Sequence, residues 1–212
     1  RVVPMLPERL SNGVCSLRPN EDKLCFSAVF EITEDAKLKK QWFGKTAIHS
    51  DRRFTYEEAQ EILETGQGDF SEEVLKLNEL AIKLRDERFS SGSIAFERVE
   101  MKFDIDEKGK PISVSFKESK ESNHLIEEFM LLANKKVAEF IGKVPEKKTP
   151  KTFVYRIHDK PDPDKLSSFN TFIKRFGHGI QLTTPRAIST SLNKLLTEVK
   201  GKNEQNVVET LA

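Results

Sequence analysis

Cysteine is scarce in this 212-residue sequence, which contains only Cys15 and Cys25. The two residues lack the spacing of metal ligands, which excludes a cysteine-based zinc site. We interpret both as reduced thiols of a cytoplasmic protein. Long apolar runs are also missing. None approaches the roughly 20 residues that cross a bilayer, and no signal peptide is visible, so we expect no membrane partner.

An excess of charge of either sign is absent as well. The 35 lysines and arginines almost balance the 34 aspartates and glutamates, and the net charge is +1. Proteins that bind nucleic acid through their overall charge are usually far more basic. The balance argues against RNA binding, although a piece of an RNA channel can still be locally basic. We interpret the most basic stretch, residues 145–151, as a solvated linker, with a nucleic-acid contact as the alternative.

What the sequence does contain is a clear succession of strand and helix patterns. Alternating apolar residues predict hairpins and a further strand, at residues 24–32 with 38–49, 94–105 with 112–117, and 152–158. Apolar stripes and caps predict helices at residues 55–65, 71–89, 123–141, 162–177 and 184–200. The first of these begins with a capping box at residues 55–58, and Asp162 and Thr184, each followed by proline, cap the last two. A further helix, which Asn203 would cap, follows them. This order indicates an α+β fold, in which an antiparallel or mixed sheet of hairpins is surrounded by helices.

Three apolar surfaces of these elements are expected to be buried. The first hairpin should bury one strand face, made of Leu24, Phe26, Ala28, Phe30 and Ile32. The second should do the same with Val99, Met101, Phe103 and Ile105. The helix at residues 123–141 is apolar nearly all round and should be buried on most sides.

Phe96 is the first candidate for a functional residue. It lies on the charged face of its predicted strand, together with Arg98, Glu100 and Lys102. An aromatic side chain there could stack on a nucleic-acid base, which is worth roughly 1–3 kcal/mol per base. It could instead be covered by the helix at residues 71–89, and the pattern alone favours that. Arg98 could reach a phosphate, although an exposed strand arginine is usually just solvated.

Glu127 is the second candidate. Glu127 and Asn134 are seven residues apart and lie within about 20° of each other around a helix. A carboxylate buried there would need a cation or several donors to stay ionised. It could border an active site, or Glu127 could form a structural pair with an arginine while Asn134 caps a loop. Glu128 points about 100° away, and we expect it to be solvated.

The remaining polar residues indicate structure rather than chemistry. His158 is interpreted as a structural strand histidine. Asp104 and Asp106 flank the turn of a hairpin, where acidic residues are common, so we do not interpret them as a metal cluster. We see no glycine-rich phosphate loop, no Ser–His–Asp arrangement and no zinc site among the histidines.

Four strings of the sequence resemble one known family. They are PMLPERLSNGVCSLRPNEDKL from residue 4, GSIAFE from residue 92, LIEEFMLLAN from residue 125 and YRIHDKPDPDK from residue 155. In order and spacing they are similar to the catalytic (RNB) domain of the ribonuclease II and ribonuclease R family, and closer to bacterial ribonuclease R. The alternative is an unrelated interaction module that matches all four strings by chance, which we do not expect.

The resemblance implies a function and two site residues. The family's members are processive 3′-to-5′ exoribonucleases that release nucleoside monophosphates from single-stranded RNA. Their magnesium ions, held by aspartates, activate water and stabilise the leaving oxygen. RNA threads through a channel to a buried site. By resemblance, Phe96 would stack on the bases at the RNA 3′ end, and Glu127 would lie beside the RNA near the catalytic centre.

The resemblance also implies that part of the family's machinery is absent. Its metal-binding aspartates and second stacking aromatic lie upstream of the matching segment, and an arginine-rich stretch lies downstream. We therefore expect residues 1–212 to be an internal fragment of one RNB-type domain that binds no metal alone, hydrolyses no RNA alone and self-associates through exposed faces. The alternative is a non-catalytic RNA-binding or scaffold protein built on the same domain.

Overall fold

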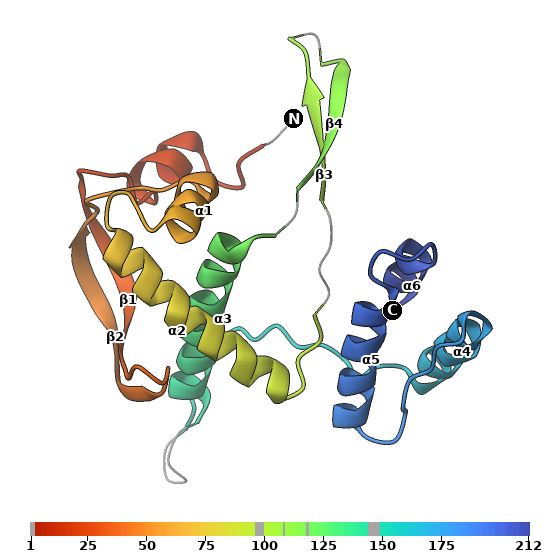
Figure 1. The fold of residues 1–212 in the computed structure, drawn as a ribbon. Coiled ribbons are helices and arrows are strands. Elements are labelled where there is room, and N and C mark those ends of the chain that lie inside the picture. The colour runs from red at the N-terminus through yellow and green to blue at the C-terminus, as the bar shows by residue number, and fades with distance from the viewer. Residues whose placement is uncertain (1–2, 96–99, 108, 118, 144–148) are drawn as a thin grey trace. The chain divides into compact units, whose positions relative to one another are not determined.

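The chain forms two compact units in the computed structural model (Figure 1), which describes residues 3–95, 100–107, 109–117, 119–143 and 149–212. The first unit combines Arg1–Ala81 with Lys120–Phe153. The second combines Ile82–Ser119 with Val154–Ala212. Each unit contains one antiparallel hairpin together with helices. The predicted α+β fold class is confirmed.

The hairpin of the first unit consists of β1 (Asp22–Ile32) and β2 (Leu38–His49). Its register runs from the pair Asp22 and His49 to the turn, with an irregularity between Glu31 and Ile32. The hairpin matches the sequence prediction. A short π-helix, η1 (Arg9–Val14), precedes it.

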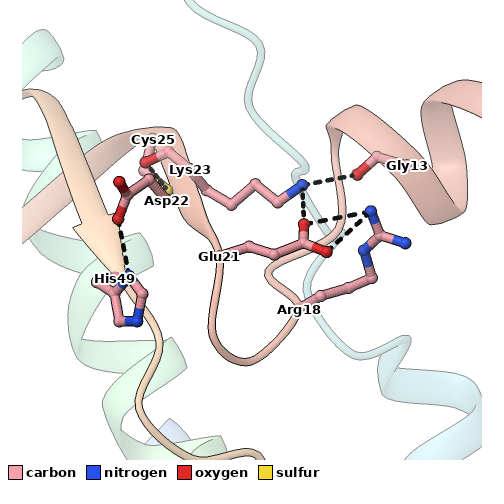
Figure 2. A network of polar contacts seen from close by, with 7 residues as sticks. All are labelled: Gly13, Arg18, Glu21, Asp22, Lys23, Cys25 and His49. Carbon is pink, nitrogen blue, oxygen red and sulfur yellow. Dashed lines mark hydrogen bonds and ion pairs between the residues drawn. The ribbon is translucent and has the colours of Figure 1, made fainter.

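Polar contacts attach η1 to the base of this hairpin. Figure 2 shows the Lys23 side chain extended toward Gly13 and Glu21. Its Nζ donates to the Gly13 carbonyl oxygen at 3.3 Å and lies 2.8 Å from a Glu21 carboxylate oxygen. Arg18 pairs with the same carboxylate at 3.2 Å, and the pKa of Glu21 is lowered, chiefly by the hydrogen bond from Lys23. His49 pairs with Asp22 at 2.7 Å across the strand pair.

Helix α1 (Tyr56–Thr65) begins at the capping box that the sequence predicted. The Glu58 backbone N–H donates to Thr55 Oγ1 at 3.1 Å, and the Thr55 backbone N–H donates to Glu58 Oε2 at 2.7 Å. This second bond is the main cause of the lowered pKa of Glu58. Gly66 ends the helix with φ 71°, a left-handed conformation that glycine adopts without strain.

Two longer helices follow. Helix α2 (Ser71–Ser90) matches its prediction and passes from the first unit into the second. Helix α3 (Glu121–Gly142) packs against α1, and the buried Ser122 N–H donates to Gln60 Oε1 at 3.1 Å. At the other end of α3, the Phe140 ring lies 4.8 Å from the ring of Phe43 in β2. Helix α3 therefore links the hairpin to α1.

The second unit has a core built from three C-terminal helices. They are α4 (Pro163–Ile173), α5 (Pro185–Val199) and α6 (Gln205–Leu211), and the 3₁₀ turn η2 (Lys174–Phe176) extends α4. Their buried apolar residues and Ile180, which lies between η2 and α5, form one cluster. Its members are Phe169, Ile173, Ile180, Leu192, Leu195, Val199 and Val208. Asp162 and Thr184 cap α4 and α5 as predicted, whereas the residue that precedes α6 is Glu204 rather than Asn203.

The second hairpin, β3 (Glu100–Ile105) and β4 (Pro111–Lys117), forms as predicted, but its apolar face is not buried. Met101, Phe103 and Ile105 are all exposed, as are Leu24 and Phe26 of β1. Among the described residues each sheet contains only two strands, and such a ribbon has no layer of its own to cover one face. The predicted burial is wrong for these three residues of β3, whereas Val99 lies outside the described residues. For β1 it is wrong at Leu24 and Phe26, but Ala28, Phe30 and Ile32 are partly buried.

Two further expectations also depended on packing and were wrong. Residues 152–158 form no strand, and Val154 and Ile157 are exposed. A strand needs a partner for its backbone groups, and alternating residues alone do not supply one. Helix α3 exposes Ile126, Met130 and Phe140, so it is not buried on most sides.

Of the helices in the described part of the chain, none has the length and apolar character of a membrane span. Cys15 is exposed, Cys25 is partly buried, and both are free cysteines.

The capping box of α1 gives a first prediction. Thr55→Ala removes the hydroxyl that accepts from the Glu58 N–H, and it should lower the free energy of unfolding by about 0.5–2 kcal/mol. Thr55→Ser keeps the accepting oxygen and serves as the matched control. Urea unfolding followed by circular dichroism measures both. Equal loss in the two variants would contradict a role for the hydroxyl.

Candidate functional site

The two candidate site regions lie in different units, and the structure describes only part of them. Phe96 and Arg98 lie outside the described residues, so their roles stay predictions. Glu127 lies on α3 in the first unit and is half-buried. Asn134, on the same helical face, is exposed. His158 is exposed in an irregular segment, so its interpretation as a strand residue is wrong.

The first turn of α3 is fixed by two contacts that lie close to Glu127 in the chain. The Lys120 backbone N–H donates to Asn123 Oδ1 at 3.1 Å. The Ser122 N–H donates to Gln60 of α1. The first helical N–H groups have no partner within the helix, so these bonds help to define where α3 begins.

The buried side of α3 is not the one expected for the glutamate pair. Glu128 is 3% exposed, whereas Glu127 is half-buried. Ser122, Leu125 and Glu128 are three residues apart and form the stripe that is buried. Helical spacing fixes the angle between Glu127 and Glu128, but only packing decides which of them faces the protein. The prediction that Glu128 is solvated is wrong, and neither carboxylate is without a partner.

The described residues do not provide a site for the magnesium ions that the resemblance implies. No group of three or more histidine, cysteine, aspartate or glutamate residues in the described ranges could hold a metal ion. Asp106 acts as a turn residue, as predicted, whereas Asp104 lies within β3 opposite Ser113 of β4. Asp106 Oδ1 accepts from the Lys110 N–H at 2.8 Å, and Asp104 Oδ2 accepts from Ser113 Oγ at 2.7 Å.

Two features near the GSIAFE string were not found by sequence reasoning. The guanidinium carbons of Arg85 and Arg88 lie 4.9 and 4.8 Å from the centre of the Phe89 ring. The four-residue spacing of Arg85 and Phe89 was a visible signal for the first of these contacts. The second feature is Asn193 of α5, which hydrogen-bonds to Ser93 and Ala95. No local signal marks it, because its partners are about 100 residues away in the sequence.

The fold is therefore an α+β arrangement of two small hairpins and packed helices. A model of the RNB domain family matches residues 1–212, and the chain belongs to this family. This confirms the resemblance recognised in the four strings.

Several relatives support the same conclusion. DIS3-like exonuclease 2 of Caenorhabditis elegans is 36% identical over 210 residues, which cover 91% of this chain and 24% of the relative. Ribonuclease R 1 of Lactococcus lactis is 32% identical over 219 residues, with coverages of 100% and 26%. A protein named inactive exonuclease DIS3L2 from Arabidopsis thaliana is 31% identical over 217 residues, with coverages of 94% and 20%. The chain thus spans about a quarter of these relatives, which come from bacteria and from eukaryotes.

A solved structure confirms the fold. RNase R of Mycoplasma genitalium, in complex with ribose methylated single-stranded RNA, matches with a TM-score of 0.85 at 24% identity. The match covers 100% of this chain and 33% of that chain.

The burial of α3 generates a second prediction. Glu128→Ala removes a side chain from the buried stripe of α3, so it should lower the free energy of unfolding by about 1–3 kcal/mol. Glu127→Ala should change it by less, and Glu121→Ala, at an exposed position of the same helix, should be near neutral. Thermal and urea unfolding of the three variants measure the order of these losses in unfolding free energy. A larger loss for Glu127→Ala than for Glu128→Ala would contradict the packing described for α3.

Proposed function

We propose that this chain is part of a processive, magnesium-dependent 3′-to-5′ exoribonuclease that hydrolyses single-stranded RNA to nucleoside monophosphates. The RNB family match over residues 1–212 carries the proposal. The names of the relatives, an exonuclease and a ribonuclease, support the same reaction class. The RNA complex of the matched RNase R structure supports single-stranded RNA as the substrate.

In this proposal the chain supplies part of the RNA channel wall. Phe96 stacks on the bases at the RNA 3′ end, Arg98 contacts a phosphate, and Glu127 lies beside the RNA. The half-buried position of Glu127 is compatible with this role, because part of the residue remains accessible. Glu128 is the less suitable candidate because it is buried in the packed stripe of α3.

The magnesium ligands are proposed to lie outside the described residues, in a longer protein that contains this chain. The chain spans about a quarter of its relatives, and its described residues hold no cluster of metal ligands. When bound, the metal ions would activate the attacking water and stabilise the leaving oxygen. We also propose that the isolated chain self-associates through exposed apolar residues such as Met101, Phe103 and Phe116.

The second candidate function is a non-catalytic RNA-binding protein built on the same domain. The Arabidopsis relative that is named inactive favours keeping this alternative, because it matches the chain at nearly the same identity as the others. The residues of this chain are compatible with both functions.

The first test of the proposal is an assay of the purified 212-residue chain on a 5′-labelled single-stranded RNA, with magnesium or with a chelator. No shortening is expected in either condition, because the metal ligands are proposed to lie elsewhere. A ribonuclease R enzyme, assayed in parallel on the same RNA, is the positive control. Magnesium-dependent laddering by the chain would show that a working site lies within these residues and that the placing of the metal centre is wrong.

A second test addresses Glu127 in a longer protein that contains the complete domain. Glu127→Gln removes the charge and keeps the shape, and it should lower kcat by about tenfold or more, or about 1.4 kcal/mol in the barrier. Its unfolding free energy should stay close to that of the wild type. Glu121→Gln is the control on the same helix. Equal losses of turnover and stability would favour a purely structural glutamate.

A further inference from the structure

One face of α5 holds the chain segment that leads into the second hairpin. Arg186, Ser189 and Asn193 are spaced by three and four residues, so they lie on the same side of the helix. Arg186 Nη2 donates to the Ser90 carbonyl oxygen in a long contact of 3.5 Å. At Gly92, where φ is 106°, an added Cβ would lie 3.2 Å from Ser189 Oγ, so the backbone passes close to α5.

The strongest contact on this face uses both ends of the Asn193 amide. Asn193 Oδ1 accepts from the Ala95 backbone N–H at 2.9 Å. Asn193 Nδ2 donates to the Ser93 carbonyl oxygen at 2.8 Å. Both distances are those of good hydrogen bonds. The amide thus satisfies one donor and one acceptor of a segment that belongs to no helix or strand.

Ile94, which lies between the two hydrogen-bonded residues, is held by packing. Ile94 packs against the core cluster of α4, α5 and α6. Residues 93–95 are therefore held by two hydrogen bonds to one side chain and by one apolar contact. A carboxylate at position 193 could accept from Ala95 but could not donate to Ser93, and an aliphatic side chain could do neither.

We propose that Asn193 is a positioning residue for Phe96, the side chain that the proposed function assigns to RNA stacking, and this inference rests on that function. Ala95 directly precedes Phe96 in the sequence, and consecutive Cα atoms are about 3.8 Å apart. The bonds of Asn193 therefore fix the backbone of the residues that directly precede Phe96. Asn193 acts through the backbone of residues 93–95 and does not itself touch the RNA.

The anchor is tested first in the 212-residue chain by hydrogen exchange of single amides. In the wild type the Ala95 N–H should be protected. In Asn193→Ala its exchange should be roughly fivefold faster or more, the factor that corresponds to one net hydrogen bond. Asn206→Ala, the same substitution at an exposed position of α6, should leave it unchanged. Equal exchange in all three proteins would overturn the proposal.

The positioning role is tested in a longer protein that contains the complete domain. End products on a 5′-labelled RNA and the KM for short and long RNAs are measured for Asn193→Ala, Phe96→Ala, the double variant and Asn206→Ala. Loss of stacking should leave longer end products and raise the KM of short RNAs by about fivefold or more relative to long ones. Asn193→Ala should shift the end products in the same direction as Phe96→Ala, and the double variant should resemble Phe96→Ala alone.

The other outcomes separate the two proposals. If the Asn193→Ala variant hydrolysed all RNAs more slowly by the same factor, with unchanged end products, Asn193 would be only structural. This result would overturn the inference. Unchanged end products in Phe96→Ala would overturn the stacking role of Phe96 and the inference with it. No hydrolysis by the wild type would contradict the exoribonuclease function itself, whereas hydrogen exchange would still decide whether Asn193 anchors Ala95.

Discussion

Hydrogen bonds from side chains to the free N–H groups at helix N-termini are the interaction on which most of this structure depends. Thr55, Asp162 and Thr184 accept from backbone N–H groups at 3.1, 2.9 and 3.1 Å, at the starts of α1, α4 and α5. Proline follows the cap in α4 and α5, where its fixed φ suits the first helical position. Each bond spans two or three residues, so it can form before any distant part of the chain is in place. The cap also sets the starting residue of the helix. Packing then places Ser189 and Asn193 of α5 toward the segment at residues 92–95.

Helix α3 depends more on contacts that are distant in the sequence. Its first turn is completed by the Asn123 side chain and by Gln60, which lies 62 residues away from Ser122. That tertiary bond brings the stripe of Ser122, Leu125 and Glu128 against the protein. Glu127 is consequently left half-buried, where its side chain retains part of its hydration. The position of the candidate RNA contact is thus set by packing between α1 and α3.

This difference between local and distant interactions explains which features could be predicted from the sequence. The hairpins, the caps of α1, α4 and α5, and the turn role of Asp106 each depend on residues close together in the chain, and the structure confirms them. The strand at residues 152–158 and the burial of Met101 or Phe103 required a partner surface, which alternation cannot supply. The prediction that Glu128 is solvated failed for the same reason. Family resemblance, in contrast, identified the RNB domain because whole strings carry information that periodicity does not.

The entry to the second hairpin shows how polar anchoring can replace burial. The apolar side chains of β3 are exposed, so the hairpin gains little stability from covering that face. The chain is nevertheless fixed five residues before β3 begins, by the two bonds of Asn193 and the packed side chain of Ile94. An amide suits this place because a backbone C=O and a backbone N–H two residues apart need one donor and one acceptor together. Leaving either group unsatisfied would cost about 1–3 kcal/mol where it is buried. The same requirement makes Asn193 difficult to replace by any other residue of its size, whatever the chain does with RNA.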